Sequence, residues 1–127
     1  MDAEKITINL GAVDLGKVDV LVDEGFYSNR TDFIRTAIRN QLDKHEGDMN
    51  RSITRKAMSV GAFHFSRKDL EEQIATGQKV AISAVGMLSI GSDVTPELAR
   101  DTIDSVTVRG VFRASKEVKA ALADRTH

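Results

Sequence analysis

One short segment near the N-terminus, residues 5–10, restricts the possible folds most strongly. It reads Lys5-Ile6-Thr7-Ile8-Asn9-Leu10, alternates polar and apolar side chains and ends at Gly11, which predicts a single strand. No neighbouring segment carries the pattern of a second strand. A lone strand leaves its backbone N–H and C=O groups unpaired, so pairing with the same strand of a second subunit is the economical solution. The sequence therefore predicts a homodimer.

Two amphipathic helices are predicted after this strand. The first runs from Val13 to about Glu24 and stops at Gly25, and the second begins after Ser28 or Asn29 as N-cap and runs to about His45. The apolar stripes are Leu15, Val18, Leu21 and Val22 in the first helix, and Phe33, Ile34, Ala37, Ile38 and Leu42 in the second. One strand and two helices bury too little apolar surface to be stable alone, which again favours an intertwined dimer.

The chain divides at a polar, glycine-containing stretch without periodicity. We predict an N-terminal domain over residues 1–46, a linker over 47–54 and a C-terminal domain over 55–127. Three segments of the C-terminal domain can be aligned on Gly61, Gly86 and Gly110, and helix starts follow at Ser66, at Thr95 with Pro96, and at Ser115. These glycines are 25 and 24 residues apart, and such a period is typical of stacked repeats. We therefore expect a small α/β domain of about three strand-helix units, with an ordinary α/β domain as the alternative. The fold class is α+β.

The polar side chains of the predicted strand are candidates for contact with DNA. If Ile6, Ile8 and Leu10 face the helices, then Lys5, Thr7 and Asn9 face the other way. A two-stranded antiparallel ribbon fits the major groove, where lysine, asparagine and threonine side chains can bond to base edges. The alternative is that these residues simply form the solvent face of an amphipathic strand.

Residues 4–45 resemble the ribbon-helix-helix superfamily and are most similar to its CopG-type transcriptional regulators. The resemblance rests on residues 6–10, on the helix from Leu15 to Val22, and above all on residues 25–39, which are similar to the family's glycine turn, polar cap and small-apolar helix. It implies that Lys5, Thr7 and Asn9 contact bases. It also implies that the N-terminus of the second helix, at Ser28, Asn29 and Arg30, points at the DNA backbone, while the other role for Ser28 and Asn29 is helix capping.

Charge gives this interpretation no general support. The formal net charge is −1, and carboxylates outnumber basic side chains by nine to six among residues 1–46, so a DNA-binding face must be a local basic patch. Arg35 and Arg39 lie on one helical face, where pairing with Asp32 and Asp43 or exposure to solvent competes with contact to phosphates. Arg51, Arg55 and Lys56 belong to the most basic stretch and are possible accessory contacts to the DNA backbone.

The sequence offers few candidate residues for catalysis or for binding a metal ion or cofactor. The chain has no cysteine and three histidines, and it contains none of the common nucleotide-binding, hydrolase or metalloprotease motifs, so we expect no enzyme, no cofactor and no metal site. No segment reads as a membrane span or a secretion signal, and we expect the protein in the cytoplasm at the nucleoid.

We therefore expect a homodimeric transcriptional regulator, most simply a repressor that binds double-stranded DNA. Its C-terminal repeats would provide higher oligomerisation, partner binding or effector sensing. Two alternatives are an antitoxin, whose C-terminal part binds a toxin, and a DNA-attached structural protein that assembles through its C-terminal repeats.

Overall fold

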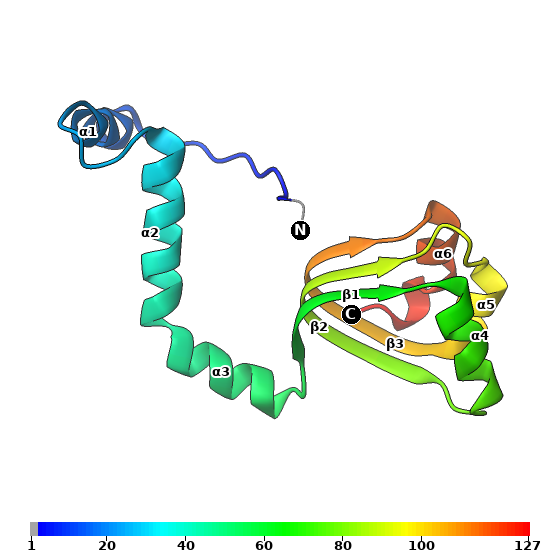
Figure 1. Cartoon of the computed structure of the whole chain (residues 1–127). Coiled ribbons are helices and arrows are strands. Elements are labelled where there is room, and N and C mark those ends of the chain that lie inside the picture. The colour runs from blue at the N-terminus through cyan, green and yellow to red at the C-terminus, as the bar shows by residue number, and fades with distance from the viewer. Residues whose placement is uncertain (1–2) are drawn as a thin grey trace. The chain divides into compact units, whose positions relative to one another are not determined.

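The computed structural model describes residues 3–127 and divides into two units. An N-terminal unit spans residues 3–52, and a C-terminal unit spans residues 53–127 (Figure 1). The division falls inside the stretch that was predicted as a linker. No helix within residues 3–127 combines the length and the apolar composition needed to cross a bilayer.

The N-terminal unit contains the two predicted helices. Helix α1 is Ala12–Asp23 and helix α2 is Arg30–Lys44, which confirms both predictions to within two residues. Gly25 ends α1 with φ of +83°, its N–H bonds to the carbonyl of Val22, and the N–H of Phe26 bonds to the carbonyl of Leu21. This pair of bonds is a Schellman motif, which favours glycine because L side chains resist a positive φ.

The predicted linker has regular structure. Residues 47–54 lie within helix α3, Glu46–Arg55, instead of forming an irregular connection. Acidic side chains in its first turn and Arg55 in its last turn complement the helix dipole, and Asp48 pairs with Arg51 one turn later. Met49 and Ile53, four residues apart and partly buried, lie on one face of this helix, and the charge interactions add to its stability.

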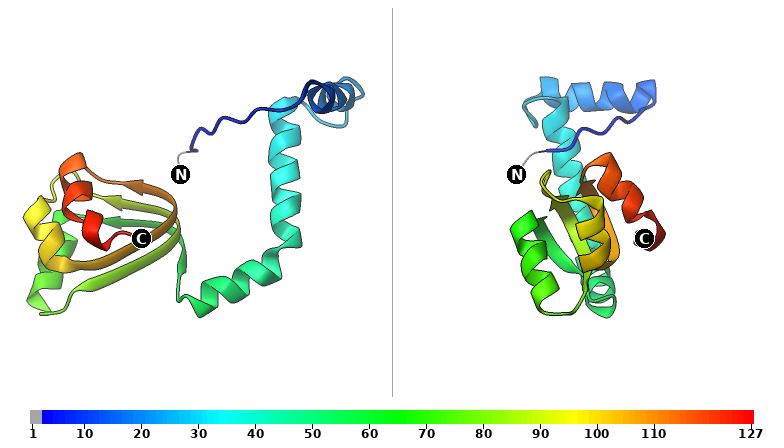
Figure 2. Two further views of the ribbon diagram at one scale, coloured as in Figure 1. Left: turned by 180° about the vertical axis from the view of Figure 1, so that it is seen from behind. Right: turned by 90° about the vertical axis from the view of Figure 1, so that its right-hand side faces the viewer.

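The C-terminal unit is a stack of three strand-helix repeats. Strands β1 (Ser59–Phe65), β2 (Val80–Ile90) and β3 (Ile103–Arg113) are parallel and adjacent in that order. Helices α4 (Arg67–Ala75), α5 (Pro96–Thr102) and α6 (Lys116–Ala121) follow them, and all three helices lie at one end of the sheet (Figures 1 and 2). Ser66, Thr95 and Ser115 cap these helices through side-chain hydrogen bonds, which confirms the three predicted helix starts.

The register of the sheet pairs the residues that the sequence alignment placed together. Gly61 pairs with Gly86, and Gly86 pairs with Gly110. All three have positive φ, of +147°, +132° and +126°, and β2 and β3 bend sharply near their middles (Figure 1). A Cβ on Gly86 would lie 2.2 Å from the Gly61 carbonyl oxygen, and one on Gly110 would lie 2.0 Å from the Gly86 oxygen. Glycine is therefore required here by conformation and by space.

The core of the C-terminal unit lies between the bent strands and the helices. Its fully buried members include Leu70, Leu88, Ile103, Val118 and Leu122, so every repeat contributes to one cluster. The N-terminal unit differs sharply, because Val18 is its one buried residue among the described ones. The C-terminal unit thus has a core within a single chain, and the N-terminal unit does not.

Candidate nucleic-acid interface

The N-terminal unit carries an open apolar hollow between its first residues and its two helices. The hollow has a volume of about 470 Å³ and is lined by Ile8 and Leu10, by Asp14, Lys17, Val18 and Leu21 of α1, and by Phe33, Ile34, Ala37 and Ile38 of α2. Ile8 and Ile38 remain about half exposed, at 54% and 45%. Soluble chains rarely leave so continuous an apolar surface uncovered, so this surface is typical of an interface with another chain.

Residues 3–11 form neither helix nor strand in the single chain, and they run as an uncoiled trace (Figure 1). Because Ile8 and Leu10 line the apolar hollow, alternation along an extended segment directs Thr7 and Asn9 away from it. Lys5, Thr7 and Asn9 are all exposed. A strand needs a neighbour to bond to, and the described residues of one chain offer none to this segment, so the paired ribbon stays a prediction.

The N-terminus of α2 is closed by a cap in which three residues cooperate. The side chain of Asn29 accepts a hydrogen bond from the N–H of Asp32 at 2.8 Å, and the Asp32 carboxylate accepts bonds from the N–H and the hydroxyl of Ser28, both at 3.0 Å. The backbone bond from Ser28, aided by its hydroxyl, holds the pKa of Asp32 below its ordinary value. Ser28 and Asn29 therefore have the capping role that was one of their two predicted roles.

This cap leaves part of the helix end available to a ligand. Among the described residues, no hydrogen bond engages the N–H groups of Arg30 and Thr31, the first two positions of α2. Unbonded N–H groups and the positive end of the helix dipole favour an anion at this place.

The Arg30 side chain is turned to α1. Its Nε and Nη2 atoms each donate to a different carboxylate oxygen of Asp19 at 2.8 Å, so the interaction is bidentate. The Arg30 side chain lowers the pKa of Asp19, and the Asp19 side chain raises the pKa of Arg30, in each case chiefly through the hydrogen bonds. This bidentate ion pair holds the start of α2 against α1. The two residues are 11 positions apart on different helices, so no local spacing in the sequence signals the pair.

Two other arginines border the end of α2. A polar hollow of about 450 Å³, called the α2 hollow below, is lined by Ser28, Asn29, Thr31, Asp32, Arg35 and Arg39. In the described part of the chain no ion pair within 4.0 Å engages Arg35 or Arg39, and both residues are exposed, which agrees with the predicted alternative of a solvated face and not with pairing to Asp32 and Asp43. The α2 hollow thus brings the first turn of α2 together with the guanidinium groups of Arg35 and Arg39 and with the Asp32 carboxylate, whose pKa the charge of Arg39 also lowers.

The possible accessory residues lie at the C-terminal end of α3. Arg51 pairs with Asp48, whereas Arg55 and Lys56 are exposed at and just after the last turn. Across residues 3–127 no group of three or more histidine, aspartate or glutamate side chains is placed to hold a metal ion.

Comparison with known proteins places the chain in a family. The model of a family described as the ribbon-helix-helix transcriptional regulator family matches residues 1–119, which is nearly the whole chain and includes most of the C-terminal unit. No curated protein and no solved structure matches.

Proposed function

Because the chain belongs to the ribbon-helix-helix transcriptional regulator family, we propose that it is a homodimeric repressor whose paired residues 5–10 read the major groove of double-stranded DNA. The apolar hollow carries the proposal most directly. A second copy laid over it would cover the half-exposed Ile8, Leu10 and Ile38 and would bring two copies of the segment together. Each strand of this ribbon would then present Lys5, Thr7 and Asn9 to base edges.

The phosphate contacts of this proposal come from the start of α2. The N–H groups of Arg30 and Thr31 and the guanidinium groups of Arg35 and Arg39 would bind one DNA phosphate beside the ribbon. Ser28 and Asn29 would shape this site as caps, and the Arg30 side chain would orient α2 through Asp19. Arg55 and Lys56, with Arg51 once it leaves Asp48, would add contacts to neighbouring phosphates.

As a repressor, the dimer would block access to a promoter and would catalyse no reaction. It would act in the cytoplasm, at the nucleoid. The antitoxin alternative relies on a C-terminal part that becomes ordered on a toxin. The C-terminal unit has a buried core within one chain, which favours the regulator over the antitoxin.

Fluorescence anisotropy tests the proposal with two duplexes, one from upstream of the protein's own gene and one of random sequence, over a salt series. The variant Thr7→Ala/Asn9→Ala is expected to lose discrimination between the duplexes while it still binds both. The variant Arg35→Ala/Arg39→Ala is expected to weaken binding to both alike and to reduce the salt slope by about 1 for each phosphate that the variant no longer neutralises.

Arg67→Ala serves as a control that removes one positive charge outside the proposed DNA-binding unit. Arg67 is paired with Glu71 in α4, outside the N-terminal unit, so this variant is expected to bind like the wild type. If the wild type binds neither duplex at micromolar concentration in low salt, the proposal is wrong.

A further inference from the structure

Two carboxylates engage the start of α2 within the single chain. Asp19 of α1 accepts two hydrogen bonds from the Arg30 guanidinium, each at 2.8 Å. Asp32 accepts bonds from the N–H and the hydroxyl of Ser28, both at 3.0 Å. Arg30 is the first residue of α2, and Ser28 lines the α2 hollow. Each carboxylate therefore holds a group that lies at the proposed phosphate site.

The Asp32 carboxylate also lies among the cationic groups of the α2 hollow. It lines this hollow together with Arg35 and Arg39. Hydrogen bonds from Ser28 lower the pKa of Asp32 most, and the charge of Arg39 lowers it further, so the carboxylate is ionised at neutral pH. A DNA phosphate in the α2 hollow would share it with this negative charge, and like charges repel each other.

The Asp19 carboxylate neutralises a positive charge that DNA could use. Both partners of the pair are about half exposed, Arg30 at 55% and Asp19 at 43%, so a phosphate can reach the guanidinium. If Arg30 turned from Asp19 to a phosphate, an unpaired carboxylate would remain beside the DNA and would attract a cation from solution. Binding to DNA is favoured because cations are released from it, so this exchange gains little.

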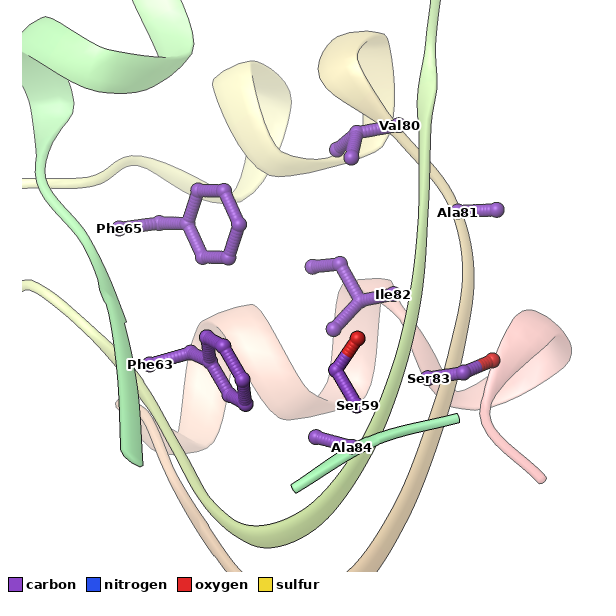
Figure 3. Close-up of a pocket in the computed structure, with 8 residues that line it drawn as sticks. All are labelled: Ser59, Phe63, Phe65, Val80, Ala81, Ile82, Ser83 and Ala84. Atoms are coloured by element: carbon purple, nitrogen blue, oxygen red, sulfur yellow. The ribbon is translucent and has the colours of Figure 1, made fainter. Parts of the chain in front are cut away.

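The cavity described in the C-terminal unit differs in kind from the α2 hollow. It has a volume of about 150 Å³. Its inner side chains, which point toward one another, are Phe63, Phe65, Val80 and Ile82 (Figure 3). No charged side chain lines it. A phosphate would lose its hydration there without gaining a charged partner, so this cavity does not compete with the start of α2 for phosphates.

We propose that Asp19 and Asp32 are autoinhibitory: their carboxylates compete with DNA phosphates for the start of α2 and keep the affinity for DNA of every sequence low. The inference rests on the proposed function for the identity of the anion, a DNA phosphate. Phosphate contacts carry no sequence information, so both carboxylates weaken binding to promoter and random DNA alike. They also give a role to the acidic excess of residues 1–46, which have nine carboxylates and six basic side chains.

Asparagine substitutions test the inference, because they remove each charge and keep an oxygen that can accept a hydrogen bond. Asp19→Asn and Asp32→Asn are compared with the wild type by fluorescence anisotropy, with the promoter-derived and random duplexes over a salt series. Each variant is expected to bind both duplexes about three- to tenfold more tightly at about 0.1 M salt, and to steepen the salt slope by up to about 0.9, as for one more neutralised phosphate. The ratio of the two affinities should stay unchanged.

Asp43→Asn is the matched control. It removes the same charge from α2, about three turns and roughly 16 Å beyond Asp32, which exceeds the Debye length of about 10 Å at 0.1 M salt. Its affinity should change by less than about twofold. The double variant Asp19→Asn/Arg30→Ala is compared with Arg30→Ala alone. Most of the gain from Asp19→Asn should be lost in this background, because the gain requires the Arg30 guanidinium.

Three results would overturn the inference while the wild type still binds DNA, so that the proposed function stands. The two variants may bind like the wild type or like Asp43→Asn, which shows no competition. They may bind more weakly with an unchanged helical signal and sedimentation coefficient, which shows that the carboxylates position α2 for DNA. Asp19→Asn may give the same gain with and without Arg30, which shows general repulsion instead of competition.

Retention on heparin, a sulfated polyanion, separates the inference from the proposed function. If no form of the protein binds either duplex while Asp19→Asn and Asp32→Asn elute from heparin at higher salt than the wild type and Asp43→Asn, the proposed function is wrong. The autoinhibitory role of the two carboxylates toward polyanions then stands. If no form binds a duplex and all elute from heparin at the same salt concentration, both are wrong.

Discussion

At the scale of single residues, glycines and caps determine the local geometry of both units. Gly25 ends α1, and the row of Gly61, Gly86 and Gly110 lets neighbouring strands bend together. Asp32 and Asp69 each accept backbone hydrogen bonds at a helix start. The residue types are visible in the sequence, whereas the crowding at the glycines depends on which strands are neighbours.

Gly86→Ala should destabilise the C-terminal unit strongly. The new Cβ would lie 2.2 Å from a backbone oxygen on a residue with φ of +132°, so the expected loss is about 3 kcal/mol or more of unfolding free energy. Gly77→Ala is the matched control, since Gly77 has φ of +72° but a Cβ there would meet nothing within 4 Å, and it should lose about 1 to 2 kcal/mol. Urea denaturation measures both, and equal losses would contradict steric crowding at the glycine row.

Acid should weaken the start of α4 through Asp69. The backbone N–H of Ser66, and then its side chain, lower the pKa of Asp69. A carboxyl whose pKa is lower in the folded state stabilises above its unfolded pKa, and this stabilisation is lost as the pH falls through the folded pKa, below about pH 4. Asp69→Asn should therefore lower stability at about pH 7 and reduce its fall between about pH 5 and pH 3. Urea denaturation at several pH values measures this fall in the free energy of unfolding. If the fall is the same in Asp69→Asn as in the wild type, this role of Asp69 is contradicted.

At the scale of elements, the N-terminal unit has amphipathic helices but no core of its own. α1 and α2 turn their apolar residues toward residues 8 and 10, yet the surface that they share stays open in the single chain. Their packing is therefore incomplete until a partner covers it. The bidentate pair of Arg30 and Asp19 aligns the two helices but lies in solvent, so it adds little stability by itself.

Leu10→Asp should abolish the N-terminal dimer. The substitution places a carboxylate in the apolar hollow, where a second copy would bury it without a partner charge. Asn9→Asp is the matched control, because it adds the same charge on the opposite side of the segment and should leave the dimer intact while it weakens DNA binding. The helical signal of α1 and α2 and the sedimentation coefficient distinguish the two. A dimer that survives Leu10→Asp unchanged would show that this hollow is not its interface.

At the scale of the whole molecule, the two units should unfold separately. The C-terminal unit has a buried core, whereas the N-terminal unit has one buried residue among those described and would gain a core only in the proposed dimer. Two thermal transitions are therefore expected, and the N-terminal midpoint should rise with protein concentration and with added duplex DNA. Calorimetry at two concentrations tenfold apart, with amide exchange to assign each transition, checks this. A single transition whose midpoint changes with neither protein concentration nor added DNA would contradict separate unfolding of the two units.

The elements with a local cause could be predicted from the amino-acid sequence. Periodicity, caps and glycine stops predict α1, α2 and the three helix starts of the repeats, and the glycine spacing anticipates the strand register. The same reasoning missed α3, whose apolar stripe is limited to Met49 and Ile53 in a short, polar, glycine-containing segment.

The contacts between distant residues could be known only from the packed chain. Packing directs Arg30 to Asp19, leaves Arg35 and Arg39 at the α2 hollow, and caps β3 with Thr126 and His127. These pairings join residues far apart in sequence, and each depends on how separate helices and strands approach one another. Local propensity acts over a few residues, whereas contacts of this kind arise only once the chain has packed.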